Sequence, residues 1–285
     1  MISTPDRIGD IVGAYLTEQC TVIIDSEADL RAGEDVVHPT RVAVRRLRST
    51  IRVFADLFDQ TQAQQLDAEL VWWAGMLGAV RDIDILSVRL ADRLAELPTE
   101  VVMGPVQSTI QAELALLRKK GSDAVLAGLD SERYRKLVAL IRRWRSDPPL
   151  TPAADELPEV IKRYVKTAKK KVRKRLARAV AARKAGEPSA ELFHRARKAA
   201  KRNRYAAEAA APVWGDKSER IVENRKNLQD LLGDHQDSIV CAAFLRDLGA
   251  RRGIRSGQNC FTYGVLYAME TAAGDSLLTD LKPFL

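Results

Sequence analysis

The sequence lacks most features that mark membrane-spanning, secreted and disulfide-bonded proteins. It contains no run of about 18 or more apolar residues, so no segment can form a transmembrane helix. Its first residues are charged and include no apolar segment like that of a signal peptide. The three cysteines, Cys20, Cys241 and Cys260, form no C-x-x-C pair, which excludes a disulfide framework and most zinc sites. We therefore expect a cytoplasmic protein that does not associate with membranes.

Motifs for nucleotide binding and nucleophilic catalysis are also missing. The sequence has no G-x-x-x-x-G-K-[ST] loop, no G-x-G-x-x-G turn and no G-x-S-x-G elbow. It has only three histidines, His38, His194 and His235, and no H-x-x-x-H pair or carboxylate cluster accompanies them. We expect no enzymatic activity, no cofactor and no metal site. Two alternatives stay open: the three histidines could meet around a metal ion, or one of them could accept a phosphoryl group.

What is present is a helical pattern over nearly the whole chain, with prolines at the joints. The pattern predicts an all-α fold, and the proline-rich segment 147–158 is the expected linker between two four-helix bundles at 1–150 and 151–285. The predicted helices are at about 6–32, 39–58, 62–97, 106–120, 131–146, 158–185, 189–211, 217–234, 235–249 and 258–273.

Two motifs recur in the second half of the chain at nearly one separation. The motif H-x-x-R-x-x-x-R-R-x-R starts at His38, and its counterpart, with lysine at one position, starts 156 residues later at His194. The motif L-G-x-x-[RQ]-D starts at Leu77 and again 155 residues later at Leu232. A period of this length indicates a duplicated domain, and such copies often pack about a pseudo-two-fold axis. We interpret the second motif as a turn after its glycine, with its aspartate orienting nearby arginines.

Positive charge is concentrated in the second half of the chain. The whole sequence has 46 basic and 38 acidic side chains, but residues 156–285 hold 27 basic and 15 acidic ones. Within residues 162–204, 18 basic residues face only two acidic ones. So dense a positive charge repels itself, and we expect an anion to accompany that surface.

The helical periodicity sorts the first motif into two stripes. Five residues fall within an arc of about 80°: His38, Arg41, Arg45, Arg48 and Arg52. Arg46 and Arg202 lie off this ridge, and an apolar stripe lies about 120° from it: Val44, Leu47, Ile51, Phe54 and Phe58. One stripe therefore packs into the bundle and the other is a basic ridge. No acidic residue lies between Arg41 and Arg52, and like charges four residues apart repel. The absence of neutralising partners favours an external polyanion.

Segments around these motifs resemble the hallmark segments of the CHAD family, the conserved histidine α-helical domain. They read VHPTRVAVRRLRSTIRVF, LGAVRDIDIL, FHRARKAAKRNRYAAE and LQDLLGDHQD, and the resemblance covers residues 6–275. It implies two four-helix bundles related by a pseudo-two-fold axis. It also implies binding of inorganic polyphosphate in a basic groove at their junction, and association with polyphosphate granules. The implied contacts are His38, Arg41, Arg45, Arg46, Arg48, His194, Arg197, Lys201, Arg202 and Arg204.

Some features depart from the family pattern or extend it. Asn203 stands where the first copy has Leu47, and Glu208 stands where the second ridge would have a counterpart of Arg52. Relatives often carry a triphosphate-processing domain of the CYTH type; we find no room for one and expect a stand-alone binding module. Further basic residues extend the predicted polyphosphate site along the first ridge and along one face of helix 158–185. They are Arg52, Lys162, Arg163, Lys166, Lys169, Lys170 and Arg173.

The predicted function is thus the non-catalytic binding of polyphosphate. Arginine binds phosphate oxygens in a bidentate manner, whereas lysine supplies a mobile point charge. Nucleic-acid binding through the same surface is an alternative, but Tyr205 is the only aromatic residue near the ridges that could stack on a base. A metal-dependent or histidine-dependent phosphotransfer enzyme is the other alternative.

Overall fold

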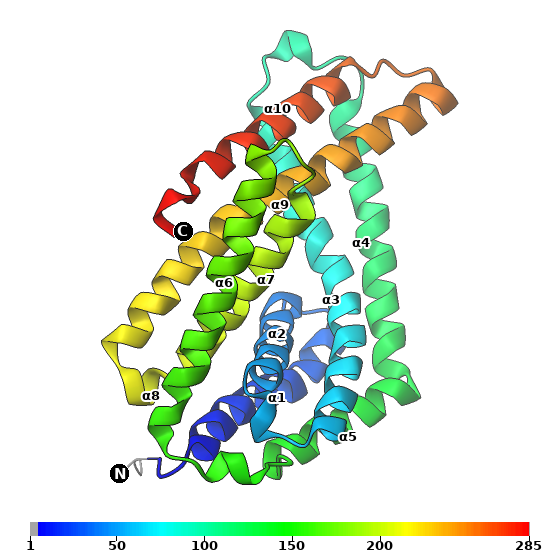
Figure 1. Ribbon diagram of the computed structural model, residues 1–285. Helices are drawn as coiled ribbons and strands as arrows, with labels where there is room; N and C mark the ends of the chain where they lie inside the picture. Colours follow the sequence, from blue (N-terminus) through cyan, green and yellow to red (C-terminus); the bar gives the residue numbers. More distant parts are fainter. Residues whose placement is uncertain (1–4, 285) are drawn as a thin grey trace. The chain divides into compact units, whose positions relative to one another are not determined.

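The computed structural model describes residues 5–284, of which 255, 256, 280 and 282 are described by their backbone alone, and over this range it is helical without a strand (Figure 1). The α-helices are α1 (Ile8–Ala32), α2 (Val37–Val53), α3 (Gln60–Ala95), α4 (Val106–Asp130), α5 (Glu132–Ser146), α6 (Ile161–Lys184), α7 (Ala190–Ala209), α8 (Ala211–Trp214), α9 (Asp216–Ser256) and α10 (Phe261–Leu277). Short 3-10 helices lie at η1 (Ala55–Leu57), η2 (Thr99–Val101), η3 (Pro152–Asp155), η4 (Pro158–Val160) and η5 (Leu278–Phe284). The predicted all-α class is confirmed.

Two long helices differ from the prediction. The segments predicted as helices 217–234 and 235–249 form the single helix α9, and the predicted turns after Gly78 and Gly233 are wrong because α3 and α9 run through both glycines. The helix predicted at 106–120 continues as α4 to Asp130. A glycine inside a helix costs only about 1 kcal/mol relative to alanine, and a long helix packed along its length tolerates that cost.

The chain forms two compact units, each made of two segments. Unit 1 comprises Met1–Gly78 and Asp123–Gln229, and unit 2 comprises Ala79–Ser122 and Asp230–Leu285. The segment predicted as a linker, 147–158, does not separate these units, because the chain on both sides of it belongs to unit 1. The internal duplication of 1–150 and 151–285 stays a prediction.

The predicted linker is itself hydrogen-bonded to the helices of unit 1. The Thr151 amide donates to the carbonyl of Leu57 over 2.9 Å, and the Ile8 amide donates to the carbonyl of Glu156 over 2.9 Å. These bonds tie the segment to η1 and to the start of α1. It therefore acts as part of the wall of unit 1 and holds the beginning of α6 in place.

In unit 1, α1 packs against α2 and α5, α7 packs against α2, and α6 lies along α7 (Figure 1). The apolar stripe predicted for α2 is buried as expected, with Val44 and Leu47 fully inaccessible to solvent, and α6 buries a stripe that includes Val172 and Leu176. Small alanines such as Ala200 fill the contact between α6 and α7, so these two helices approach closely. This packing fixes which faces of α2, α6 and α7 are left for the basic side chains.

Unit 2 has its own apolar core. Leu86 and Leu90 of α3, Ile110 of α4, Leu245 of α9 and Leu266 of α10 belong to one buried cluster. Each of these helices contributes one apolar stripe, which is the usual arrangement in a helix bundle.

Candidate anion-binding site

The packing of α2 against α7 brings the two predicted basic ridges together inside unit 1. Charges on Arg41 and Arg45 of α2 act on Lys201 of α7, and so do those on Arg197 and Arg204 of α7. We call these five residues the cationic cluster. The sequence placed its two halves 156 residues apart, and the fold makes them neighbours.

The cationic cluster has few acidic partners. Within the part of the chain that the structure describes, neither Arg45, Arg197 nor Lys201 forms an ion pair, and the buried Nε atoms of Arg45 and Arg197 have no hydrogen-bond partner. Arg204 reaches Glu208, with its Nε 3.3 Å from Oε1. A buried donor without an acceptor costs free energy, so the cluster is arranged as if an acceptor arrived from outside.

The pKa values of two residues in the cluster are lowered, which also reflects the shortage of negative charge around them. Burial, followed by the charges of Arg197 and Arg45, lowers the pKa of Lys201 from 10.5 to about 6. Burial also lowers the pKa of Arg45, and the charges of Arg41 and Arg197 add to this effect. A bound anion would favour the charged forms and reverse these shifts. The cluster can therefore bind an anion and, on doing so, take up a proton at Lys201.

A glycine of the second repeated motif makes room for one member of the cluster. A Cβ atom added at Gly78 would lie 3.3 Å from the Nη2 atom of Arg41, closer than ordinary van der Waals contact. The absent side chain thus lets the Arg41 guanidinium lie against the backbone of α3. The sequence interpretation missed this role, although the glycine recurs together with the arginine motif.

We expect Gly78→Ala to separate stability from binding. Alanine should raise helix stability by up to about 1 kcal/mol, while a displaced Arg41 should weaken polyanion binding about fivefold through a poorer charge-assisted hydrogen bond. Gly75→Ala in the same helix is the matched control, because an added Cβ atom there meets nothing within 4 Å. Thermal melting and anion titration of both variants test this; equal affinities would contradict the role given to Gly78.

Part of the predicted ridge is neutralised within the protein, which corrects the expectation that it has no acidic partners. The Nε atoms of Arg48 and Arg52 donate to Oδ1 of Asp67 over 3.1 and 3.0 Å. The Nε atom of Arg46 donates to Oε2 of Glu208 over 3.0 Å. These acids come from α3 and α7, so no inspection of α2 alone could find them.

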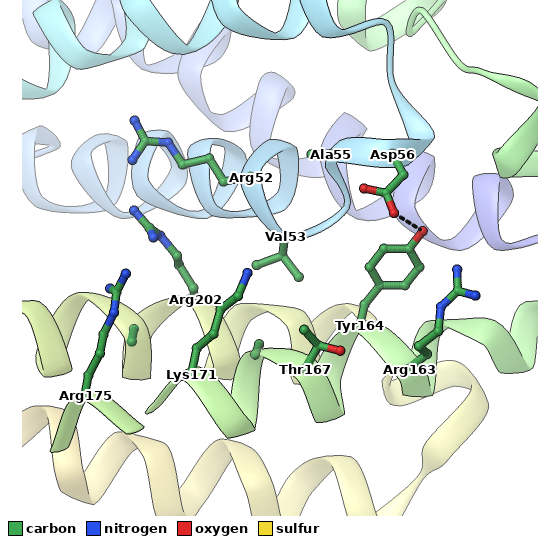
Figure 2. A pocket seen from close by; sticks show the side chains of 12 residues that line it. Arg52, Val53, Ala55, Asp56, Arg163, Tyr164, Thr167, Lys171, Arg175 and Arg202 are labelled. Carbon is green, nitrogen blue, oxygen red and sulfur yellow. Dashed lines mark hydrogen bonds between the residues drawn. The ribbon is translucent and has the colours of Figure 1, made fainter. Parts of the chain in front are cut away.

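Next to the cluster, α2, η1, α6 and α7 enclose a cavity of about 330 Å³ (Figure 2). We call it the basic cavity. Its charged lining residues are five cations and one acid: Arg52, Arg163, Lys171, Arg175, Arg202 and Asp56. Burial, and then the charges of Arg52 and Arg175, lower the pKa of Arg202. Crowded cations thus favour an anion here as well.

The lining shows which face of α6 meets the cavity. Arg163, Thr167, Lys171 and Arg175 follow one another at four-residue spacing and so share a face. The sequence interpretation missed Lys171 and Arg175, although this spacing was visible. Of the predicted α6 residues only Arg163 lines the cavity. The others, which do not line the cavity, are Lys162, Lys166, Lys169, Lys170 and Arg173.

The two repeated histidines occupy different surroundings. His38 lies exposed in the first turn of α2, whereas His194 lies one turn inside α7 and is half-buried. Burial, and then the charge of Lys198, lower the pKa of His194. Among the described side chains no three histidine, cysteine, aspartate or glutamate residues could together hold a metal ion.

The fold and this site define an all-α protein that joins basic faces of separate helices in one compact unit. The sequence matches the CHAD domain over residues 14–246, and the chain belongs to the CHAD domain family. Two uncharacterized proteins from two strains of Mycobacterium tuberculosis are each 30% identical over 284 residues, which cover 98% of this chain and 53% of theirs. The chain therefore spans about half the length of the curated relatives it matches.

Solved structures share the fold at lower sequence identity. PptA from Streptomyces chartreusis superposes with a TM-score of 0.77 and 21% identity over 98% of this chain and 99% of that one. The CHAD domain from the plant Ricinus communis superposes with a TM-score of 0.75 and 24% identity over 99% of this chain and 93% of that one. Among the described residues no helix is both long and apolar enough to cross a membrane.

Proposed function

We propose that this protein binds inorganic polyphosphate through the cationic cluster and the basic cavity, without chemical turnover. The observation that carries the proposal is the position of Lys201, which is crowded by four arginines while it forms no ion pair within the described chain. This arrangement destabilises the protein when no ligand is bound, because buried like charges repel one another. A polyanion that enters the cluster relieves this repulsion.

The chemistry of the site fits phosphate better than bases. Arginine guanidinium groups bind non-bridging phosphate oxygens in a bidentate manner, and the cluster contains four of them. Tyr205, an aromatic residue beside the cluster, is buried. Two guanidinium groups cover its ring: the Cζ atoms of Arg46 and Arg204 lie 5.6 and 4.9 Å from the ring centroid. It offers no face to a nucleobase, which disfavours nucleic acid as the ligand.

Titration with long-chain polyphosphate over a series of salt concentrations tests the proposal. We expect submicromolar affinity that weakens steeply with salt, because binding releases counterions from the chain. A variant with Arg45, Arg197, Lys201 and Arg202 changed to glutamine should lose about a hundredfold in affinity and show a smaller salt slope. The matched control changes Lys162, Lys166, Lys169 and Arg173, which removes the same charge from the outer face of α6. Equal losses in both variants would reject the assigned site.

Two further measurements address the alternatives. DNA or RNA that displaces polyphosphate at equal phosphate concentration would reject the preference for polyphosphate. Release of phosphate or a change in chain length on prolonged incubation would reject the non-catalytic role. We propose that the protein lies in the cytoplasm, on polyphosphate granules where these form.

A further inference from the structure

Three of the five cations that line the basic cavity gather at one end. Arg52, Arg175 and Arg202 lie there together, whereas Asp56 lies at the other end beside Tyr164, where Arg163 also stands (Figure 2). The Tyr164 hydroxyl donates to Oδ2 of Asp56 over 3.4 Å. The second carboxylate oxygen, Oδ1, accepts no hydrogen bond from any residue that the structure describes. The cavity thus offers three arginines at one end and, at the other, an exposed carboxylate whose Oδ1 atom has no donor among the described residues.

Other side chains border the acidic end. The Tyr164 ring lies 5.2 Å from the Phe54 ring, and the Arg163 guanidinium covers it at 5.3 Å. Beyond Arg163 stands another acid, Glu156, whose Oε2 is 3.9 Å from Nη2 of Arg163. A polyphosphate chain that continued past Tyr164 would therefore pass the carboxylates of Asp56 and Glu156.

Internal and terminal phosphates of a chain differ in the property that this geometry selects. An internal phosphate carries one negative charge and only acceptor oxygens, so it is repelled by Asp56. A terminal phosphate has a second ionisable oxygen with a pKa of about 6, by analogy with a phosphate monoester. Beside Asp56, whose charge disfavours a second negative charge, we expect the terminal phosphate to keep this proton and to donate its O–H to the carboxylate.

We propose that the basic cavity binds the terminal phosphate of a polyphosphate chain, with Asp56 marking the end of the binding track. The inference rests on the proposed function, because it states in which direction the same polyphosphate chain lies along the site. The cationic cluster would hold internal phosphates, and the cavity would hold the end.

Short linear polyphosphates with free or methyl-esterified ends, compared at equal numbers of phosphates by isothermal titration calorimetry, test the inference. We expect the capped chains to bind about tenfold more weakly, because they lose the donor to Asp56. Cyclic polyphosphate, which has no end, should bind as weakly as the capped chains. Equal affinity of free and capped chains would overturn the terminal assignment while leaving polyphosphate binding intact. Failure of every chain to bind would overturn the proposed function itself.

Two variants separate the role of Asp56 from a general effect of charge. Asp56→Asn should strengthen the binding of capped chains and bring the ratio of free to capped affinity toward one. Glu156→Gln removes an acid near Arg163 that does not line the cavity, so it should change both affinities equally and keep the ratio. If Asp56→Asn does not fold, the comparison of chain ends on the unmodified protein decides alone. A nucleoside triphosphate that binds more tightly than linear tripolyphosphate would overturn the assignment in favour of a nucleotide pocket.

Discussion

Replacement of Lys201 by methionine is expected to stabilise the unliganded protein and to weaken its binding to polyphosphate. Methionine fills a similar volume without a charge, so it removes the repulsion from the arginines of the cationic cluster. We expect the melting temperature to rise by about 3–6 °C. The affinity for polyphosphate should fall by about tenfold or more, because one charge-assisted contact is lost. Opposite changes in stability and affinity are typical of a site that is strained until its ligand arrives.

The pH dependence of stability identifies Lys201 as the cause. Its pKa in the folded protein is about 6, below the value of 10.5 for an unperturbed lysine. Between these pH values the unfolded chain binds more protons than the folded one, so this group makes stability rise as pH rises. The penalty is complete below about pH 6 and absent above about pH 10.5. Lys201→Met should flatten this slope in thermal melts.

Binding of polyphosphate should raise the pKa of Lys201 again and therefore take up close to one proton near pH 8. Calorimetric titrations in buffers of different ionisation enthalpy measure this uptake, which should vanish in Lys201→Met. The control is Lys198→Met, which changes an exposed lysine in the same helix and should leave stability, affinity and proton uptake nearly unchanged. A less stable Lys201→Met protein, or unaltered proton uptake, would contradict this account of the cluster.

The helical periodicity was enough to predict the two basic ridges, but not their surroundings. A ridge is a property of one helix, so the spacing of Arg41, Arg45 and Arg197 reveals it. The acids that neutralise part of it, Asp67 and Glu208, come from other helices. Glu208 was visible as a break in the second ridge, but its contact with Arg46, 162 residues away, depends on how α2 packs against α7.

The division into units could not be predicted for a similar reason. Prolines and charge change sharply near residue 150, and these local signals suggested a boundary. The units instead divide within the long helices α3, α4 and α9, where the sequence shows no break. Which apolar stripe joins which core depends on contacts between distant segments, and the local pattern does not contain that information.

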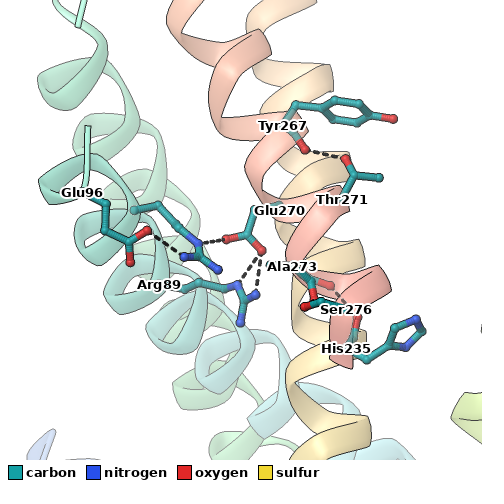
Figure 3. A network of polar contacts seen from close by, with 10 residues as sticks. Arg89, Glu96, His235, Tyr267, Glu270, Thr271, Ala273 and Ser276 are labelled. Carbon is teal, nitrogen blue, oxygen red and sulfur yellow. Dashed lines mark hydrogen bonds and ion pairs between the residues drawn. The ribbon is translucent and has the colours of Figure 1, made fainter. Parts of the chain in front are cut away.

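Unit 2 contains a buried acid that is hydrogen-bonded to two arginines of the same unit. Glu270 of α10 is fully inaccessible to solvent and accepts hydrogen bonds from Arg89 and Arg93 of α3 (Figure 3). The Nε atoms of these arginines lie 2.7 and 2.8 Å from its two carboxylate oxygens. We expect Glu270→Gln to destabilise unit 2 by about 3–5 kcal/mol, because it removes the counter-charge of Arg89 and leaves Arg93 with Glu96 alone.

The tryptophans allow this effect to be assigned to one unit. All four, at positions 72, 73, 144 and 214, belong to unit 1, so their fluorescence follows that unit while circular dichroism follows all helices. In Glu270→Gln we expect the transition seen by circular dichroism to shift to lower denaturant and to separate from the fluorescence transition. Glu96→Gln is the control, because its half-exposed carboxylate contacts Arg93 at the surface and should contribute less than about 1 kcal/mol. Transitions that stay together and unshifted in Glu270→Gln would show that the buried ion pairs do not hold unit 2, and its stability would then have to come from the apolar cluster around Leu245 and Leu266.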